Sequence, residues 1–367
     1  MQFNPIFNPS KKVNDRIFQN IKKVIKHGKF ILGPEVIKLE ESLKKFVNSK
    51  YCLCVSSGTD ALLISLLALN VKKNDEIIVP SFSWISTATM IKLIGAKTVF
   101  VDVNNDDCNI NEKLIEKKIS KKTKAIICVS LFGNTPNIQQ INKIAKKYKL
   151  AVIEDAAQSF GAYYNNKKSG NLTSIGCTSF FPSKPLGSYG DAGAIFSNNK
   201  ILFRKMKSIR THGQYKRNFH DLLGINGRID TLQCAVILEK LKYFKKELSL
   251  RKKVFEVYKN YFEKRKFKKI NIVKYEKYGK SAYAQFCILT KERKFLIEKL
   301  KESKIPYAIY YPVPMDRQKI FKSSKKSSTK ESKILSSTIL SLPFGPYLKL
   351  KDQKRVIKVF EDNKGKL

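Results

Sequence analysis

Short apolar runs alternate with longer segments of helical length over the first half of the chain. The apolar runs lie at 51–55, 76–79, 97–101, 125–130 and 151–155, with segments of helical length between them. Continuous apolar runs of this length are typical of strands buried on both faces of a parallel sheet. The intervening segments predict helices ending near 69 and lying near 85–94, 111–119 and 138–148. The pattern therefore predicts an α/β fold with a mostly parallel central sheet flanked by helices.

The second half of the chain has a different pattern. Between 231 and about 262, apolar residues recur at helical spacing and predict one long helix that leads out of the first domain. Beyond about 270 we expect a smaller α+β unit, with strands at 283–289 and 307–310, a helix at 291–303 and a terminal helix beyond 350. The Lys/Ser-rich stretch 322–333 predicts an exposed loop or a frayed helix start. We divide the chain into a large domain at 1–245, with an N-terminal arm, and a small C-terminal domain at 246–367.

Polar and aromatic residues follow several of the predicted strands at their carboxyl ends, where open α/β sheets bind ligands. Gly58 and Thr59 open a helix after the strand at 51–55, and the free N–H groups of such a helix can bind a phosphate or simply make a sharp turn. Trp84 follows the next strand and could stack on a cofactor ring or belong to the core. Asp155 ends the strand at 151–155, where it could be catalytic or cap a helix.

Lys184 is the most unusual of the many lysines. It lies in the run Ser-Phe-Phe-Pro-Ser-Lys-Pro-Leu-Gly at 179–187, among apolar and turn-forming residues with no other cation nearby. Desolvation lowers the pKa of an amine and leaves it nucleophilic. A nucleophilic lysine together with Asp155 at a strand end is the pairing expected of a pyridoxal phosphate enzyme, in which an aspartate keeps the pyridine nitrogen protonated.

Composition narrows the remaining possibilities. The 367 residues carry a formal net charge of +42, and the lysines are spread from end to end. Solvated helix faces explain this spread better than a nucleic-acid site, although an anionic substrate would also benefit. Seven scattered cysteines and three dispersed histidines predict buried thiols in a reducing compartment and no metal site. With no visible signal peptide or membrane span, we expect a cytoplasmic protein with no membrane or nucleic-acid partner.

Eight runs of the sequence, in their order, resemble one known family. They lie at 27–36, 57–62, 80–84, 154–161, 179–193, 224–233, 311–314 and 340–343. Together they resemble the DegT-like nucleotide-sugar aminotransferases, which are pyridoxal phosphate enzymes of fold type I, and the resemblance covers nearly the whole chain. It implies a large domain built on a mostly parallel sheet and a smaller C-terminal α+β domain.

The resemblance also implies roles for individual residues. Lys184 corresponds to the lysine that binds the cofactor covalently and moves the proton, and Asp155 to the partner of the pyridine nitrogen. Asn226 corresponds to a residue that reaches the partner subunit's phosphate, which implies a homodimer with shared active sites. The implied cofactor-binding residues are Gly58, Thr59, Trp84, Asp155, Gln158, Ser179, Lys184 and Asn226.

Within the family, the resemblance is strongest to enzymes that transfer an amino group from glutamate to a UDP-linked 2-acetamido-2-deoxy-3-oxo-hexuronate, for bacterial surface polysaccharides such as O-antigen. The implied substrate contacts are Gly28, Phe30, Ser183, Arg228, Tyr310 and Tyr311. Arg228 suits a carboxylate or diphosphate, or else pairs with Asp230. The chain departs from its relatives at Phe30, which lacks a hydroxyl, at Tyr310, which replaces a histidine, and at Met315–Asp316.

Three alternatives remain open at this point. One is an aminotransferase for a 3-keto- or 4-keto-6-deoxyhexose nucleotide, whose substrate has no uronate carboxylate. Another is a sugar 3-dehydratase on the same scaffold, which Lys184 disfavours because those relatives commonly have histidine at that position. The third is a basic, nucleic-acid-binding regulatory protein on a degenerate aminotransferase fold, which the net charge favours and the retained Lys184, Asp155, Gln158 and Asn226 oppose.

Overall fold

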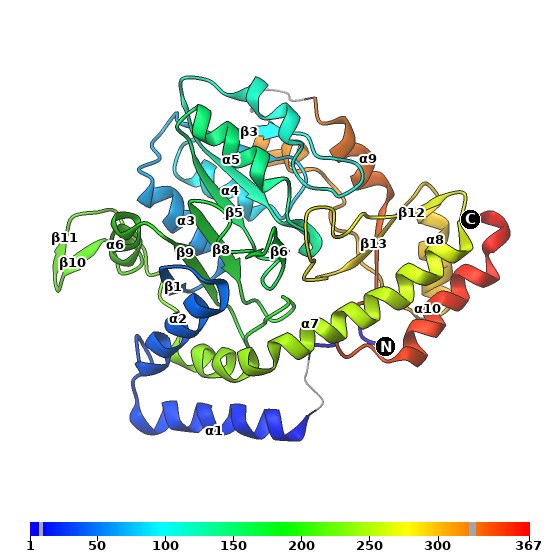
Figure 1. The fold of residues 1–367 in the computed structure, drawn as a ribbon, viewed down its shortest axis with the longest axis horizontal. Helices are drawn as coiled ribbons and strands as arrows, with labels where there is room; N and C mark the ends of the chain where they lie inside the picture. The colour runs from blue at the N-terminus through cyan, green and yellow to red at the C-terminus, as the bar shows by residue number, and fades with distance from the viewer. Residues whose placement is uncertain (7–9, 323–327) are drawn as a thin grey trace.

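A central seven-stranded sheet forms the larger part of the molecule (Figure 1). The computed structural model describes residues 1–6, 10–322 and 328–367. The strand order is β1-β9-β8-β5-β4-β2-β3, and only β9 runs antiparallel to its neighbours in the described chain. The prediction of a mostly parallel α/β sheet is confirmed. The strands are β1 (Tyr51–Val55), β2 (Glu76–Pro80), β3 (Lys97–Val101), β4 (Thr123–Val129), β5 (Ala151–Asp155), β8 (Ile175–Ser179) and β9 (Gly193–Ser197).

Helices cover both faces of this sheet because successive side chains along each strand point to opposite faces. Ile77 and Ile127 pack with α3 (Gly58–Ala68), α4 (Ser86–Leu93) and α6 (Lys200–Ile209) on one face. Their neighbours Ile78 and Ile126 pack against α5 (Ile138–Lys147) on the other face. The same second face is covered near β1 and β9 by α2 (Pro34–Val47) and by the start of α7 (Thr231–Arg265).

Helix α7 is the element that joins the two parts of the molecule (Figure 1). Its first half buries Cys234 and Ile237 in the core of the large sheet, and its second half buries Phe255 and Tyr258 in a separate core. The predicted domain boundary at residue 245 lies inside this helix. Helix α1 (Lys11–His27), which the sequence pattern did not predict, packs along α7 through a small cluster of Val13, Ile17 and Val236.

The second core belongs to a three-stranded antiparallel sheet of β12 (Ile270–Ile272), β13 (Phe286–Thr290) and β14 (Ile339–Leu342). Around it lie α8 (Arg293–Glu302), α9 (Lys330–Thr338) and α10 (Leu350–Asp362). The short elements elsewhere are β6 (Tyr163–Tyr164), β7 (Lys167–Lys168), β10 (Gln214–Lys216), β11 (Phe219–His220), η1 (Glu112–Leu114), η2 (Glu116–Lys118), η3 (Leu131–Gly133), η4 (Met315–Arg317), η5 (Lys319–Phe321) and η6 (Lys364–Lys366).

Three predicted elements were wrong or displaced. The helix expected at 111–119 is only the pair of 3-10 turns η1 and η2, with the Asn111 side chain accepting from the Lys113 N–H at the start and the Ser120 N–H donating to the Thr123 hydroxyl after the end. The strand expected at 283–289 begins at Phe286, since Tyr283 has a positive φ of 47°. The strand expected at 307–310 is a single bridge from Ala308 to Ser341. Residues 323–327 of the Lys/Ser-rich stretch lie outside the described part of the chain.

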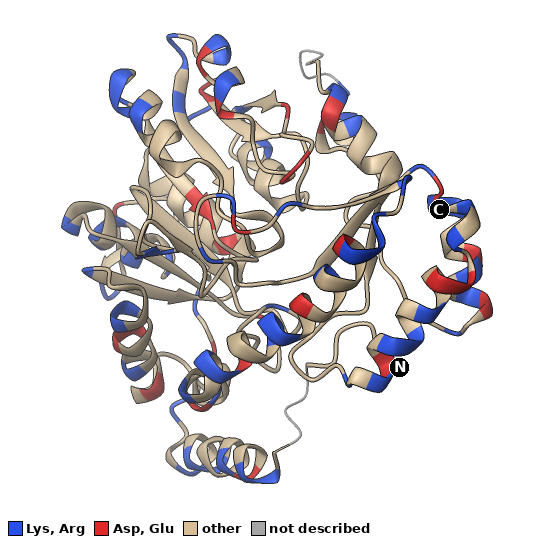
Figure 2. Cartoon of the chain, turned by 45° about the vertical axis from the view of Figure 1, so that its right-hand side comes forward, with Lys and Arg blue, Asp and Glu red and all other residues tan. Residues whose placement is uncertain are grey.

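Basic side chains are distributed over most of the helices (Figure 2), including α1, α7 and α10. This distribution agrees with lysines on solvated helix faces. All seven cysteines are buried and free, as expected. Within the described ranges, no helix is both long and apolar enough to cross a bilayer.

Candidate functional site

The carboxyl ends of the parallel strands and the smaller domain together enclose a cavity of about 430 Å³. Its walls come from the segments after β1, β2, β5 and β8, with Tyr310, Tyr311 and Gln285 contributed from beyond α7. The sequence-predicted residues that line it are Gly58, Thr59, Trp84, Asp155, Gln158, Ser179, Ser183, Lys184, Tyr310 and Tyr311. Gly28, Phe30, Asn226 and Arg228 do not line this cavity.

The N-terminus of α3 forms one end of the cavity. Ser57 caps this helix by accepting a hydrogen bond from the Asp60 N–H at 3.0 Å. The N–H groups of Gly58 and Thr59 belong to the first turn, where no helical carbonyl can accept them. A Cβ at Gly58 would lie 2.7 Å from the Cβ of Ser179, so glycine is needed for the end of β8 to come this close. Together these groups form a site for an anion such as a phosphate.

Lys184 lies in the middle of a loop whose two ends are hydrogen-bonded to each other. The Ser188 N–H donates to the Phe180 carbonyl at 2.7 Å, and the Lys184 N–H donates to the Phe181 carbonyl at 2.9 Å. Burial lowers the pKa of the Lys184 amine, and the Asp155 carboxylate opposes this shift. A lowered pKa increases the share of neutral amine, which is the nucleophilic form.

Asp155 is held by two hydrogen bonds at the end of β5. Its Oδ2 accepts from the Thr87 hydroxyl at 2.9 Å, and its Oδ1 accepts from the Ala157 N–H at 3.2 Å. Burial raises the pKa of Asp155, while these hydrogen bonds and Lys184 favour the carboxylate. The sequence analysis missed Thr87, although it stands three residues after Trp84 in the same motif and could have been noticed as a polar residue on an otherwise apolar helix face.

Gln158 has a fixed orientation above the strand ends. Its Oε1 accepts from the Phe132 N–H at 2.8 Å, so its Nε2 donates to the Tyr311 hydroxyl at 3.0 Å. The second Nε2 hydrogen is available to a ligand. Burial raises the pKa of Tyr311, which keeps its hydroxyl protonated. Trp84 is 56% exposed, with its ring centroid 6.2 Å from that of Tyr311, so it lies at the cavity wall and not in the core.

These residues fit pyridoxal phosphate group by group. The Lys184 amine can react with an aldehyde, and the Asp155 carboxylate can hold a protonated pyridine nitrogen. The free Gln158 N–H suits a ring hydroxyl, the Trp84 face suits the ring, and the start of α3 suits the phosphate. Lys184 is the one cationic side chain among the described residues that line the cavity.

The four predicted residues outside the cavity lie on two neighbouring loops. The Thr231 N–H donates to the Phe30 carbonyl at 2.8 Å, and Ile31 forms a bridge with Asp230. Phe30 is 46% exposed and Asn226 is also exposed. Arg228 has a buried Nε with no hydrogen-bond partner, and the ion pairs found among the described residues include none between Arg228 and Asp230. The sequence hypothesis of an Arg228–Asp230 pair is therefore wrong.

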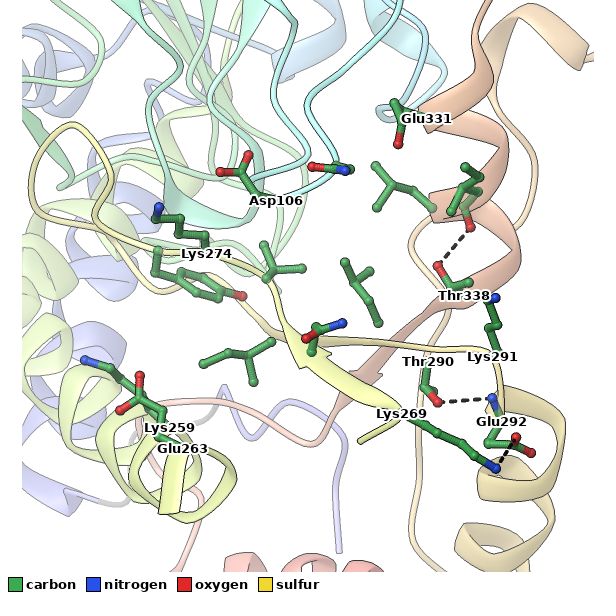
Figure 3. A pocket seen from close by; sticks show the side chains of 18 of the residues that line it. Asp106, Lys259, Glu263, Lys269, Lys274, Thr290, Lys291, Glu292, Glu331 and Thr338 are labelled. Atoms are coloured by element: carbon green, nitrogen blue, oxygen red, sulfur yellow. Dashed lines mark hydrogen bonds and ion pairs between the residues drawn. The ribbon is translucent and has the colours of Figure 1, made fainter. Parts of the chain in front are cut away.

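A larger cavity, of about 1210 Å³, lies between the second half of α7, strand β12 and helix α9 (Figure 3). Apolar side chains such as Ile272 and Leu289 line it, with charged residues around them. One of these, Lys269, forms an ion pair with Glu292 at 3.0 Å. None of the sequence-predicted site residues lies among the described residues that line this larger cavity.

Comparisons with known proteins agree with this geometry. The sequence profile of the DegT/DnrJ/EryC1/StrS aminotransferase family matches residues 11–361. The chain is 42% identical to the UDP-2-acetamido-2-deoxy-3-oxo-D-glucuronate aminotransferase of Pseudomonas aeruginosa, over 95% of this chain and 96% of that protein. The structure resembles a DegT DnrJ EryC1 StrS aminotransferase from Brucella abortus, with a TM-score of 0.95, 35% identity and full coverage of both chains. It also resembles NtdA from Bacillus subtilis with bound cofactor PMP, with a TM-score of 0.92 and 29% identity, covering 99% of this chain and 84% of that one.

Proposed function

Because the chain belongs to the DegT/DnrJ/EryC1/StrS aminotransferase family, whose members are pyridoxal phosphate enzymes, we propose that it aminates a nucleotide-linked keto-sugar. The proposed reaction transfers the amino group of glutamate to the 3-keto group of a UDP-linked 2-acetamido-2-deoxy-3-oxo-hexuronate. The product would serve bacterial surface polysaccharide synthesis in the cytoplasm. Identity of 42% over nearly the full length to an enzyme named for that substrate supports the choice of sugar.

In this proposal the residues of the cavity divide the work of binding and proton transfer. Pyridoxal phosphate, when bound, supplies an aldehyde that accepts an amino group and a ring that withdraws electrons from the substrate carbon. Lys184 binds that aldehyde and, once free, uses its neutral Nζ to remove and return the proton at the substrate carbon. Asp155 keeps the pyridine nitrogen protonated. Gln158 and Trp84 orient the ring, and the N–H groups of Gly58 and Thr59 with Ser179 hold the phosphate.

The second part of the proposal concerns the loops that carry Phe30 and Arg228 and their place in a homodimer. Gly28, Phe30, Asn226 and Arg228 lie away from the cavity of their own chain. We propose a homodimer in which they reach the cavity of the partner subunit, where Asn226 contacts the phosphate and Arg228 the uronate carboxylate. The unpartnered Arg228 Nε supports this role, since a buried guanidinium nitrogen without an acceptor is costly. Ser183, Tyr310 and Tyr311 contact the sugar from within the same chain.

One observation carries the proposal. The Lys184 amine, whose pKa is lowered by burial, and the Asp155 carboxyl group line the same cavity at the strand ends. The test is a coupled assay with glutamate and a panel of keto-sugar nucleotides that includes the 3-oxo uronate. We expect turnover with the uronate and formation of 2-oxoglutarate. Turnover of neutral 6-deoxy sugars alone would support the 6-deoxyhexose alternative, in which Arg228→Ala leaves activity unchanged.

A further inference from the structure

Besides the apolar packing that Leu186 shares with α7, two polar side chains of this helix contact the segment that carries Lys184. Lys240 is buried, with 7% exposure, and its Nζ donates a hydrogen bond to the Gly187 carbonyl. The same Nζ lies 5.6 Å from the ring centroid of Tyr189. Two helical turns earlier on the same face of α7, Gln233 accepts a hydrogen bond from the Tyr189 N–H at 3.0 Å.

The backbone of the loop is shaped to allow this close approach. A Cβ at Gly190 would lie 2.8 Å from the Gln233 Nε2, so the glycine makes room for α7. The carbonyl that Lys240 holds belongs to Gly187, three residues beyond Lys184 and within the loop closed by the Ser188–Phe180 hydrogen bond. A displacement of that carbonyl would therefore move Lys184 itself.

A buried ammonium is a costly way to stabilise a loop. Burial lowers the pKa of Lys240, and Arg251 acts in the same direction while Glu247 opposes it. An apolar side chain of similar length would fill the same space without that cost. What it would lose is the donor to the Gly187 carbonyl.

We propose that Lys240, assisted by Gln233, is a positioning residue that holds the loop so that the Lys184 amine stays buried beside Asp155. The inference rests on the proposed role of Lys184 in binding pyridoxal phosphate. It adds that part of the geometry of the amine is set from α7, the helix that also packs into the second core. Neither residue touches the cavity.

The test compares Lys240→Met, which keeps the length and loses the donor, with Lys240→Arg, which keeps a charged donor. Lys168→Met is the matched control. Lys168 Nζ also donates to a carbonyl, that of Phe46, and lies 4.1 Å from that residue's ring centroid. Neither Phe46 nor Tyr163, the other ring near this amine, belongs to the loop that carries Lys184. The readouts are the pH midpoint of the visible absorbance of protein loaded with pyridoxal phosphate, and kcat and KM measured separately.

We expect Lys240→Met to move the absorbance midpoint upward, because a displaced loop exposes the Lys184 amine to solvent and burial is what lowers the pKa of that amine. We also expect kcat to fall by about tenfold with little change in KM, as a small misplacement of a reacting group does. Lys240→Arg should restore most of the original absorbance midpoint and most of the original kcat. Lys168→Met should match the unsubstituted protein in both quantities. Gln233→Met, which leaves the buried charge in place, should give a smaller shift in the same direction.

Three results would overturn the proposal, and they are distinguishable from one another. If loaded, unsubstituted protein shows no pH-dependent absorbance from a cofactor on Lys184, the proposed function fails and the inference with it. If that absorbance is present but Lys240→Met and Gln233→Met both keep the original midpoint and kcat, only the positioning role is wrong. Including Gln233→Met keeps the test decisive even where Lys240→Met does not fold. A shift as large in Lys168→Met would also contradict the proposal, since it would show a general effect of losing a lysine–carbonyl contact.

Discussion

Burial acts in opposite directions on the two titratable residues of the candidate site, raising the pKa of Asp155 and lowering that of Lys184. Each shift favours the neutral form, because the charged form loses its hydration. The mutual attraction of the two groups limits both shifts. Burial thus favours the neutral forms of the two groups and their mutual attraction favours the charged forms, and a lowered pKa suits an amine that must gain and lose a proton during turnover.

This burial predicts a pH-dependent gain in stability when Lys184 is replaced. The folded protein binds the lysine proton more weakly than the unfolded chain, so a protonated Lys184 costs stability at neutral pH. That cost disappears as the pH rises toward the ordinary lysine pKa of 10.5. In cofactor-free protein, Lys184→Met should raise the Tm by about 2 °C at neutral pH and by less as the pH rises. Calorimetry across this pH range is the check, and Lys143→Met, at an exposed position on α5, is the control. A difference in Tm between Lys184→Met and the unsubstituted protein that grows with pH would contradict the account.

Thr87 carries a second prediction at this scale. Its hydroxyl donates to Asp155 Oδ2 and favours the carboxylate, so Thr87→Val should raise the pKa of Asp155 further and weaken its hold on the pyridine nitrogen. We expect kcat to fall by about tenfold, since a hydrogen bond to a charged group is typically worth 1.5–3 kcal/mol. Thr87→Ser retains the hydroxyl and should stay close to the original rate. Equal kcat in all three proteins would show that Thr87 does not tune Asp155.

At the scale of secondary-structure elements, the sequence predicted best those strands whose residues form a continuous apolar run. The strands at 51–55 and 151–155 were predicted at their observed bounds because buried parallel strands are continuous apolar runs. β8 was missed because its Ile-Gly-Cys-Thr-Ser sequence has too few branched apolar residues. The contact of Thr87 with Asp155 joins residues 68 positions apart, and no local pattern encodes such a pairing.

The start of α9 gives a prediction for one element. Asp102, buried beside β3, accepts hydrogen bonds from the N–H groups of Glu331 and Ser332 at 2.8 and 2.9 Å. It therefore caps a helix 230 residues away and ties α9 to the large sheet. Asp102→Ala should lower the free energy of unfolding by about 2 kcal/mol, the upper range for a lost N-cap. Urea denaturation measures this free energy of unfolding. Asp102→Asn should lie between the unsubstituted protein and Asp102→Ala, because its side chain keeps one acceptor oxygen. An unchanged urea midpoint for Asp102→Ala would exclude the cap.

At the scale of the whole molecule, the sequence correctly indicated the family and the sheet, but it did not show which predicted site residues share a cavity within one chain. Ten of them do, whereas Gly28, Phe30, Asn226 and Arg228 lie on two adjacent loops outside it. That division is the physical reason to propose a shared site in a homodimer. The proposed separation into two domains near residue 245 likewise stays a prediction, with α7 crossing between the two cores.

Subunit mixing tests the shared site. In a mixed dimer of Lys184→Ala and Asn226→Ala chains, one cavity has an intact Lys184 together with an intact Asn226 from the partner. Random re-association of two inactive variants should therefore restore about a quarter of the original activity, since half of the dimers are mixed and each has one complete site. Mixing Lys184→Ala with Asp155→Asn chains is the control and should restore none, because these two residues belong to the same cavity. No recovery in the first mixture would contradict a site built from two subunits.

The most direct test of the central claim is to locate the residue that binds the cofactor covalently. Protein loaded with pyridoxal phosphate is reduced with borohydride, digested and mapped by peptide mass spectrometry. The account predicts one reduced phosphopyridoxyl group, on Lys184, and none in Lys184→Ala treated in the same way. A modification on any other lysine of this lysine-rich chain, or no modification at all, would contradict it.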